Sequence, residues 1–225
     1  MSLGTPLGIS HRRRLLDAEL ARRLGDFAGV VLEIGVKRTR RGAFRPPSSR
    51  VRAWLRVDLD HGERPDAVAD VQALPVRDAS VDWIVCLEVM QYVASPEAAV
   101  REIARALRPG GATVVSAPFL HRSDGPTDRH RFTEVRLREL LAGPGLRVDS
   151  VVAQAAFFGT LANHLRQAVA HAPGRWARWP LALATRPLEI VLLAADRLGA
   201  VRDSAFLSSF STGFVVVARK TTERS

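Results

Sequence analysis

Cysteine and long apolar runs are scarce in this chain of 225 residues. Its single cysteine, Cys86, excludes an intramolecular disulfide and indicates a reducing compartment. No stretch reaches the roughly 18 uninterrupted apolar residues that a membrane-spanning helix needs. The basic residues 11–14 are followed by a segment that carries charges, and not by the apolar core of a signal peptide. Together these absences predict a cytoplasmic protein.

Acidic residues are outnumbered by basic ones. The chain has 33 Lys and Arg against 23 Asp and Glu, which gives a formal net charge of +10 and a pI near 11.3. This excess favours anionic partners such as phosphates, nucleic acid or an anionic membrane surface. Because arginine supplies nearly all of the basic charge, a GC-rich coding sequence is an alternative explanation.

The composition and the hydrophobic periodicity predict one globular α/β domain. Hydrophobic residues make up 47% and charged residues 25% of the chain. The periodicity predicts a helix over residues 12–28 and strands over 30–34, 51–57, 66–71, 81–87, 112–117, 146–152 and 213–218. Ser95, Pro96 and Glu97 have the marks of a helix start, and Thr133 is a candidate cap for another helix. This alternation predicts an open, doubly wound, mostly parallel sheet of seven strands.

The expected domain organisation places all of residues 1–225 in a single unit. An N-terminal helix occupies 1–28, a core 29–153, a helical insertion or cap 154–211, and the last strand 212–220. The insertion contains Trp176, Trp179 and the apolar run 188–195, and its arginines outnumber its acidic residues. These features favour a helical lid whose apolar face packs on the sheet or on a second subunit. Peripheral membrane contact is the alternative interpretation. The oligomeric state is left open.

Three predicted strands end in groups that suit a nucleotide-like ligand. In doubly wound sheets, ligands bind at the carboxyl ends of the strands. Gly35 ends the first strand and permits close approach to the backbone, and Asp58 follows it by 23 residues, a spacing that suits a carboxylate on ribose hydroxyls. Asp70 could accept a hydrogen bond from an exocyclic amine. For both aspartates a turn or cap carboxylate is the alternative interpretation.

Five ordered segments resemble the motifs of class I S-adenosylmethionine-dependent methyltransferases, of the bacterial type 11-like kind. These segments are residues 33–35, 57–58, 69–75, 82–93 and 107–111, and the resemblance covers about residues 28–153 and 213–220. It implies a Rossmann-like methyltransferase fold with a helical insertion before the last strand, and S-adenosylmethionine as cofactor. The cofactor-binding residues that it implies are Glu33, Gly35, Lys37, Asp58, Leu59, Asp70, Val71, Leu87 and Glu88. Glu33 and Gly35 would line the methionine end, Asp58 the ribose and Asp70 the adenine amine.

The segment 118–133 resembles the Pro-x-Asp-x-x-Arg-Phe-Thr loop of bacterial methyltransferases linked to sugar or cell-surface glycan modification. His121 and His130 are the candidate general bases, because imidazole titrates near neutral pH. Asp128, Arg131 and Tyr92 are the candidate substrate-binding residues. The alternative interpretation is that Asp128 and Arg131 have a structural role and hold this loop in place. The sequence gives no sign of a metal site.

The loop after Gly35 departs from the glycine-rich pattern of nucleotide-binding turns. Val36, Lys37 and Thr39 stand where glycines are expected, and Lys37 could meet the cofactor carboxylate or a substrate phosphate. The leading hypothesis is methyl transfer to an oxygen or nitrogen of a small molecule, with anionic molecules, sugars and lipid-linked glycans as candidate acceptors. The alternative is a binding or regulatory protein that kept the fold without catalysis. Nucleic acid is not expected as a partner, because the basic stretch 37–52 carries only one aromatic residue.

Overall fold

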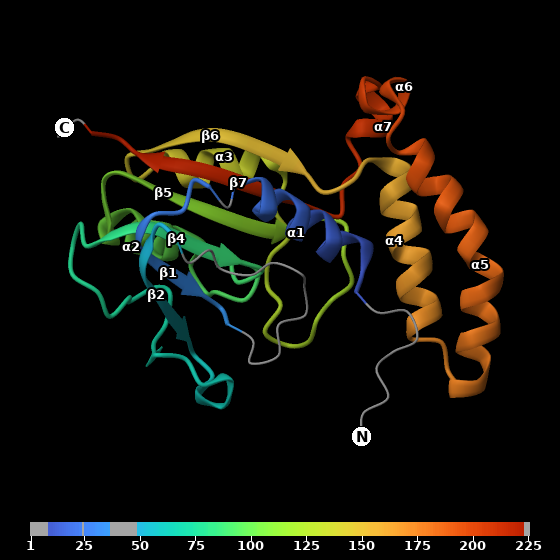
Figure 1. Ribbon diagram of the computed structural model, residues 1–225, viewed down its shortest axis with the longest axis horizontal. Helices are drawn as coiled ribbons and strands as arrows, with labels where there is room; N and C mark the ends of the chain where they lie inside the picture. Colours follow the sequence, from blue (N-terminus) through green and yellow to red (C-terminus); the bar gives the residue numbers. More distant parts are fainter. Residues whose placement is uncertain (1–8, 24, 37–48, 223–225) are drawn as a thin grey trace.

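A seven-stranded sheet forms the centre of the computed structural model, which describes residues 9–23, 25–36 and 49–222. Its strand order is β3-β2-β1-β4-β5-β7-β6, and β7 alone runs antiparallel to its neighbours (Figure 1). The strands are β1 (Gly29–Ile34), β2 (Val51–Asp58), β3 (Ala67–Val68), β4 (Val81–Leu87), β5 (Leu107–Pro118), β6 (Leu146–Ala153) and β7 (Gly213–Lys220). This topology confirms the predicted open, doubly wound, mostly parallel α/β fold.

Most of the helices lie between successive strands, and four of them form the segment before β7. The helices are α1 (His11–Arg22), α2 (Pro96–Ala106), α3 (Glu134–Ala142), α4 (Phe157–Ala170), α5 (Arg175–Ala195), α6 (Gly199–Arg202) and α7 (Ala205–Ser208), with a short 3-10 helix η1 (His61–Glu63) after β2. Ser95 and Thr133 cap α2 and α3 as predicted, each accepting a hydrogen bond of 3.2 Å from the backbone N–H three residues later.

Three predicted boundaries were wrong. Helix α1 ends at Arg22 instead of residue 28, just before Gly25, a residue type that favours helix termination. Strand β3 covers two residues of the predicted 66–71, because the Asp70 carboxylate accepts the Gln72 N–H and turns the chain. Strand β5 begins at Leu107 instead of Ala112, with an irregularity in its pairing to β4.

Alternate residues of the strands build two cores on the two faces of the sheet. On one face, Leu32 and Ile34 of β1 belong to a large cluster with Ile103 of α2 and Leu137 of α3. On the other face, Val31 packs with Leu16 and Leu20 of α1 and with Phe27 and Trp83. The sheet is therefore covered on both sides, as a mostly parallel sheet requires.

Helices α4 and α5 form a hairpin beyond the carboxyl ends of the parallel strands (Figure 1). Its packing against α1 centres on Glu189 of α5, which is fully buried. Its Oε2 accepts from His11 Nε2 and Arg166 Nη1, both at 3.2 Å, and lies 3.3 Å from Arg186 Nη1. Asp196, which is distant in sequence, caps the start of α4, because its Oδ1 accepts a hydrogen bond from the Gly159 N–H at 2.8 Å.

Within residues 9–23, 25–36 and 49–222, no helix is both long enough and apolar enough to cross a bilayer.

Candidate active site

The turn after β1 depends on a glycine. Gly35 has a φ of +79°, which L side chains rarely adopt, and a Cβ at this position would lie 2.1 Å from Val89 Cγ2. Its N–H donates to the Val57 carbonyl at 2.9 Å and ties the turn to β2. The backbone of β1 therefore approaches the loop after β4 closely, as the sequence predicted for a ligand-binding turn.

A cavity of about 390 Å³ opens beside this turn, over the ends of β1, β2 and β4. Gly35, Asp58, Leu59, Asp70, Val71 and Glu88 of the predicted cofactor residues line it, together with Val89, Tyr92, Val93, Ala94 and Arg129. The lining combines carboxylates, which suit ribose hydroxyls and an exocyclic amine, with apolar side chains, which suit an adenine ring. We call this the cofactor cavity.

Both aspartates of the cofactor cavity also hold turns. Asp58 Oδ1 accepts the Asp60 N–H at 2.8 Å. Asp70 accepts from the backbone N–H and from the side-chain amide of Gln72, each at 2.9 Å. A carboxylate offers about four acceptor positions, so these bonds leave capacity for a ligand. The two interpretations of these residues are therefore compatible.

A second cavity of about 740 Å³ adjoins the first and shares Gly35, Glu88 and Tyr92 with it. Side chains from α1, β4, the loop after β5 and α4 line it, and they include Arg12, Arg13, Arg122, Arg131, Arg166, His121, His171, Asp124 and Asp128. This lining is polar and mostly cationic. We call it the acceptor cavity.

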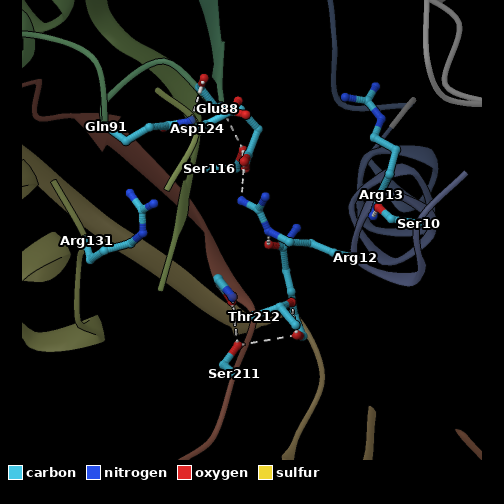
Figure 2. Close-up of polar contacts among 12 residues, drawn as sticks. Ser10, Arg12, Arg13, Glu88, Gln91, Ser116, Asp124, Arg131, Ser211 and Thr212 are labelled. Carbon is cyan, nitrogen blue, oxygen red and sulfur yellow. Dashed lines mark hydrogen bonds and ion pairs between the residues drawn. The ribbon is translucent and has the colours of Figure 1, made fainter. Parts of the chain in front are cut away.

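Glu88 forms the wall between the two cavities and has a strained backbone. Its φ of +60° is unusual for a residue with a side chain, and such outliers cluster at functional sites. The hydroxyl of Ser116 donates to Glu88 Oε1 at 2.7 Å, and Arg12 forms an ion pair with Glu88 Oε2. Figure 2 shows Arg12 reaching from α1 to Glu88 and Ser116, at the ends of β4 and β5.

The loop between β5 and α3 is held by an internal ion pair. Arg131 Nη1 and Nη2 each donate to one oxygen of Asp128 at 2.5 Å, and Nη2 also donates to the Arg122 carbonyl at 2.6 Å. The hydrogen bonds from Arg131 lower the pKa of Asp128 to about 2. Tyr92 fastens the loop to the end of β4, because its hydroxyl donates to Asp124 Oδ2 at 2.8 Å. Asp128 and Arg131 thus pin the loop and line the acceptor cavity at once.

The two candidate bases differ in their surroundings. His121 lines the acceptor cavity, and its buried Nδ1 has no partner among the described residues. Burial, together with the Arg12 guanidinium, lowers the pKa of His121 to about 4. His130 instead places Nε2 3.1 Å from the Val93 carbonyl and packs on Phe132, and it is not among the residues that line the cavities described here. Of the two candidate bases, His121 is therefore the one that lines the acceptor cavity.

Three predicted cofactor residues lie elsewhere. Glu33 points to the α1 face of the sheet, where its Oε2 accepts from Trp54 Nε1 at 2.7 Å, and it is not among the lining residues of the cofactor cavity. Leu87 lines the acceptor cavity instead. Lys37 lies outside the described residues.

Helix α1 and helix α4 with its C-terminal end also line the acceptor cavity, which was not predicted; these residues include Arg12, Arg13, Arg166 and His171. A signal for Arg12 was present, because consecutive arginines in the first turn of a helix oppose the helix dipole and call for an acidic partner elsewhere. Nothing comparable marks Arg166, whose place depends on the packing of α4 against α1 and α5.

Comparison with known proteins agrees with this geometry. Residues 50–115, which contain β2, β3, β4, α2 and most of β5, match the family described as methyltransferase domain. This part of the chain is therefore similar to a methyltransferase domain. A curated protein of Mycolicibacterium smegmatis, described as a probable S-adenosylmethionine-dependent methyltransferase, is 34% identical over 112 residues. This match covers 46% of the present chain and only 41% of the relative.

Solved structures share the fold of this chain at low identity. The methyltransferase in complex with the Trm112 activator of Haloferax volcanii has a TM-score of 0.59 and 20% identity, covering 93% of this chain and 91% of its own. Phosphoethanolamine N-methyltransferase 2 of Haemonchus contortus, in complex with S-adenosyl-L-methionine, has a TM-score of 0.57 and 14% identity, covering 92% and 52%. The [4+2]-cyclase SpnF reaches 0.57 and 17%, covering 92% and 81%. One fold thus supports different reactions.

Proposed function

We propose that the protein transfers a methyl group from S-adenosylmethionine to an oxygen or nitrogen atom of a small molecule. The observation that carries this proposal is the junction of the two cavities, which share Gly35, Glu88 and Tyr92. A methyl donor in one cavity and an acceptor in the other would meet there. Alignment of the two reacting atoms can supply a large part of what an enzyme contributes to such a displacement.

The donor set of the cofactor cavity fits S-adenosylmethionine. Asp58 would accept hydrogen bonds from the ribose hydroxyls, and Asp70 would accept from the adenine amine between Val71 and Val93. When bound, S-adenosylmethionine supplies an electrophilic methyl group on its sulfonium. Glu88 carries a carboxylate on the shared wall, where it would favour a cation.

The acceptor cavity favours a polar acceptor with anionic or hydroxyl groups, such as a sugar or a lipid-linked glycan. Several arginines line it, and neutral His121 presents an unpartnered Nδ1. We assign two roles to His121. It accepts a hydrogen bond that orients the acceptor hydroxyl or amine, and it takes up the proton that this group loses. A cytoplasmic location would suit this role.

A binding or regulatory protein without catalysis is the second candidate. It is favoured by the engagement of Glu88 with Arg12 and Ser116, and by the missing glycines after Gly35. Retention of S-adenosylmethionine without formation of S-adenosylhomocysteine, over a panel of sugar and phosphosugar acceptors, would support this candidate.

Calorimetric titration with S-adenosylmethionine and S-adenosylhomocysteine tests the cofactor assignment. Replacing Asp58 with alanine removes the carboxylate for the ribose hydroxyls, and hydrogen bonds to a charged group contribute about 1.5–3 kcal/mol. We therefore expect affinity to fall roughly tenfold to a hundredfold. Asp60→Ala is the matched control, because Asp60 is a neighbouring carboxylate that caps η1 and is not among the lining residues.

Two results would contradict these assignments. The absence of binding heat and of a thermal shift with the unaltered protein would overturn the cofactor assignment. Equal affinities of the Asp58→Ala and Asp60→Ala proteins would overturn the ribose role of Asp58.

A further inference from the structure

The outer face of α5 exposes a continuous apolar surface. Helix α5 packs on α4 through Ala182 and Leu192, which are buried. On the other side, its large apolar residues are all exposed, namely Trp176, Trp179, Leu181, Leu183, Leu188, Ile190 and Val191. Trp176 is 93% exposed and Leu183 78%. Figure 1 shows α5 as the outermost element beyond the carboxyl ends of the strands. An exposed apolar face of this size marks an interaction surface.

The exposed charges beside this face are cationic. The single acidic residue of α5, Glu189, is fully buried, and Asp196 after its end is 5% exposed and holds α4. Arg186 and Arg197 are exposed. Arg186 follows Leu183 by three residues and precedes Ile190 by four, so helical spacing places it at the edge of the apolar face.

We propose that the outer face of α5 docks on the surface of an anionic lipid bilayer. An apolar helix face with tryptophans and flanking arginines is suited to the boundary between headgroups and acyl chains. Tryptophan favours this boundary because its ring is apolar and its N–H is polar, and the arginines would meet lipid phosphates.

A second copy of the chain fits this face less well. In a symmetric dimer the same surface patch of both copies meets, so Arg186 and Arg197 of both copies would lie in one interface. Arg186 is already paired with the buried Glu189, but α5 offers no exposed carboxylate to Arg197. Juxtaposed like charges disfavour such a contact, whereas anionic lipid removes the repulsion.

Docking would also bring the acceptor cavity to the membrane surface. Helix α4 supplies Arg166, Gln167 and His171 to that cavity and carries α5 on its other side. Helices α4 and α5 therefore separate the cavity from the proposed lipid-facing side by about two helix diameters, roughly 20 Å. The binding surface is tested without cofactor or acceptor, so it stands or falls separately from methyl transfer.

Co-sedimentation with vesicles tests the proposal directly. The unaltered protein should bind vesicles of phosphatidylcholine and phosphatidylglycerol at least tenfold more tightly than vesicles of phosphatidylcholine alone. Trp176→Ser combined with Leu183→Ser should weaken binding to the anionic vesicles at least tenfold. Arg197→Glu should weaken it severalfold. Brominated acyl chains should quench tryptophan fluorescence in the unaltered protein and not in a Trp176→Phe, Trp179→Phe variant.

Two exposed apolar residues elsewhere provide the matched control. Val68 and Val135 are 52% and 64% exposed on β3 and α3, and their replacement by serine should leave vesicle binding unchanged. Thermal unfolding and circular dichroism check that every variant is folded. The proposal is overturned if the unaltered protein does not bind anionic vesicles, or if the α5 double variant binds them equally well. A dimer in solution that the double variant dissociates would assign the face to a second copy instead.

Discussion

At the scale of single residues, His121 and Gly35 best show how surroundings decide chemistry. His121 is a neutral imidazole because burial and the Arg12 guanidinium disfavour its charged form and lower its pKa to about 4. It can accept a proton or a hydrogen bond at neutral pH without first having to lose a proton. Gly35 acts through the absence of a side chain, because the loop after β4 fills the space that a Cβ would occupy.

The pH dependence of the reaction follows from His121. Its imidazolium forms only as the pH falls toward about 4, so protonation of His121 should not lower kcat/KM between pH 8 and pH 6. His121→Gln keeps polar atoms but no titratable proton, and it should lower kcat at least tenfold. His130→Gln should leave kcat within about threefold, since His130 contacts Val93 and is not among the cavity-lining residues. An inflection near pH 6.5 that disappears in His121→Gln would show that His121 is not shielded as described.

Replacement of Gly35 by alanine should be more costly than replacement of a glycine with similar backbone geometry. Gly35→Ala adds a clash with Val89 to the strain of positive φ, and we expect about 2–4 kcal/mol of lost unfolding free energy in urea denaturation. Gly174→Ala is the control, because Gly174 has a φ of +88° and nothing within 4 Å of the added Cβ. We expect about 1–2 kcal/mol there. Val89→Ala should restore part of the stability of Gly35→Ala, and failure to do so would argue against the clash.

At the scale of elements, buried charges join the α4–α5 hairpin to the rest of the protein. Glu189 of α5 contacts His11 of α1 and Arg166 of α4, and all three side chains are buried. A buried ion pair contributes little net stability, but removal of one partner leaves an uncompensated charge. These contacts therefore determine the placement of the helices that carry Arg12 and His171 to the acceptor cavity.

Glu189→Gln should loosen this hairpin. With Arg166 left unpaired in a buried place, we expect a loss of about 3–5 kcal/mol in unfolding free energy, together with faster proteolysis within α4 and α5. Glu134→Gln is the control, because Glu134 forms an exposed pair with Arg138 on α3 and its loss should cost less than about 1 kcal/mol. Equal stability of the two variants would show that the Glu189 cluster does not hold the hairpin.

Local signals in the sequence were enough to predict most elements. An apolar run between Gly29 and Gly35 predicted β1, a second apolar run predicted β4, and the caps Ser95 and Thr133 predicted the starts of α2 and α3. The cap of α4 could not be predicted, because the capping carboxylate belongs to Asp196, 37 residues after Gly159. Such a contact exists only after α4 and α5 have packed.

At the scale of the whole molecule, the sequence predicted one cavity better than the other. The cofactor cavity is built from strand ends, which a parallel sheet brings to one edge, so Gly35, Asp58 and Asp70 could be grouped in advance. The acceptor cavity depends on long-range contacts, such as the pair of Arg12 with Glu88, 76 residues apart. The sequence can indicate that Arg12 needs an acidic partner, but only the packing of the helices determines which carboxylate that partner is.

The place of β7 in the sheet has a consequence for synthesis of the protein. Residues 213–220 form an inner strand between β5 and β6, so both neighbours lack a pairing partner on that side until this segment has left the ribosome. A nascent chain that has emerged only as far as the α4–α5 hairpin therefore presents two open strand edges, and such edges promote wrong pairing between chains. Completion of the sheet has to be a late event, and chaperones that shield strand edges would act on the chain before it.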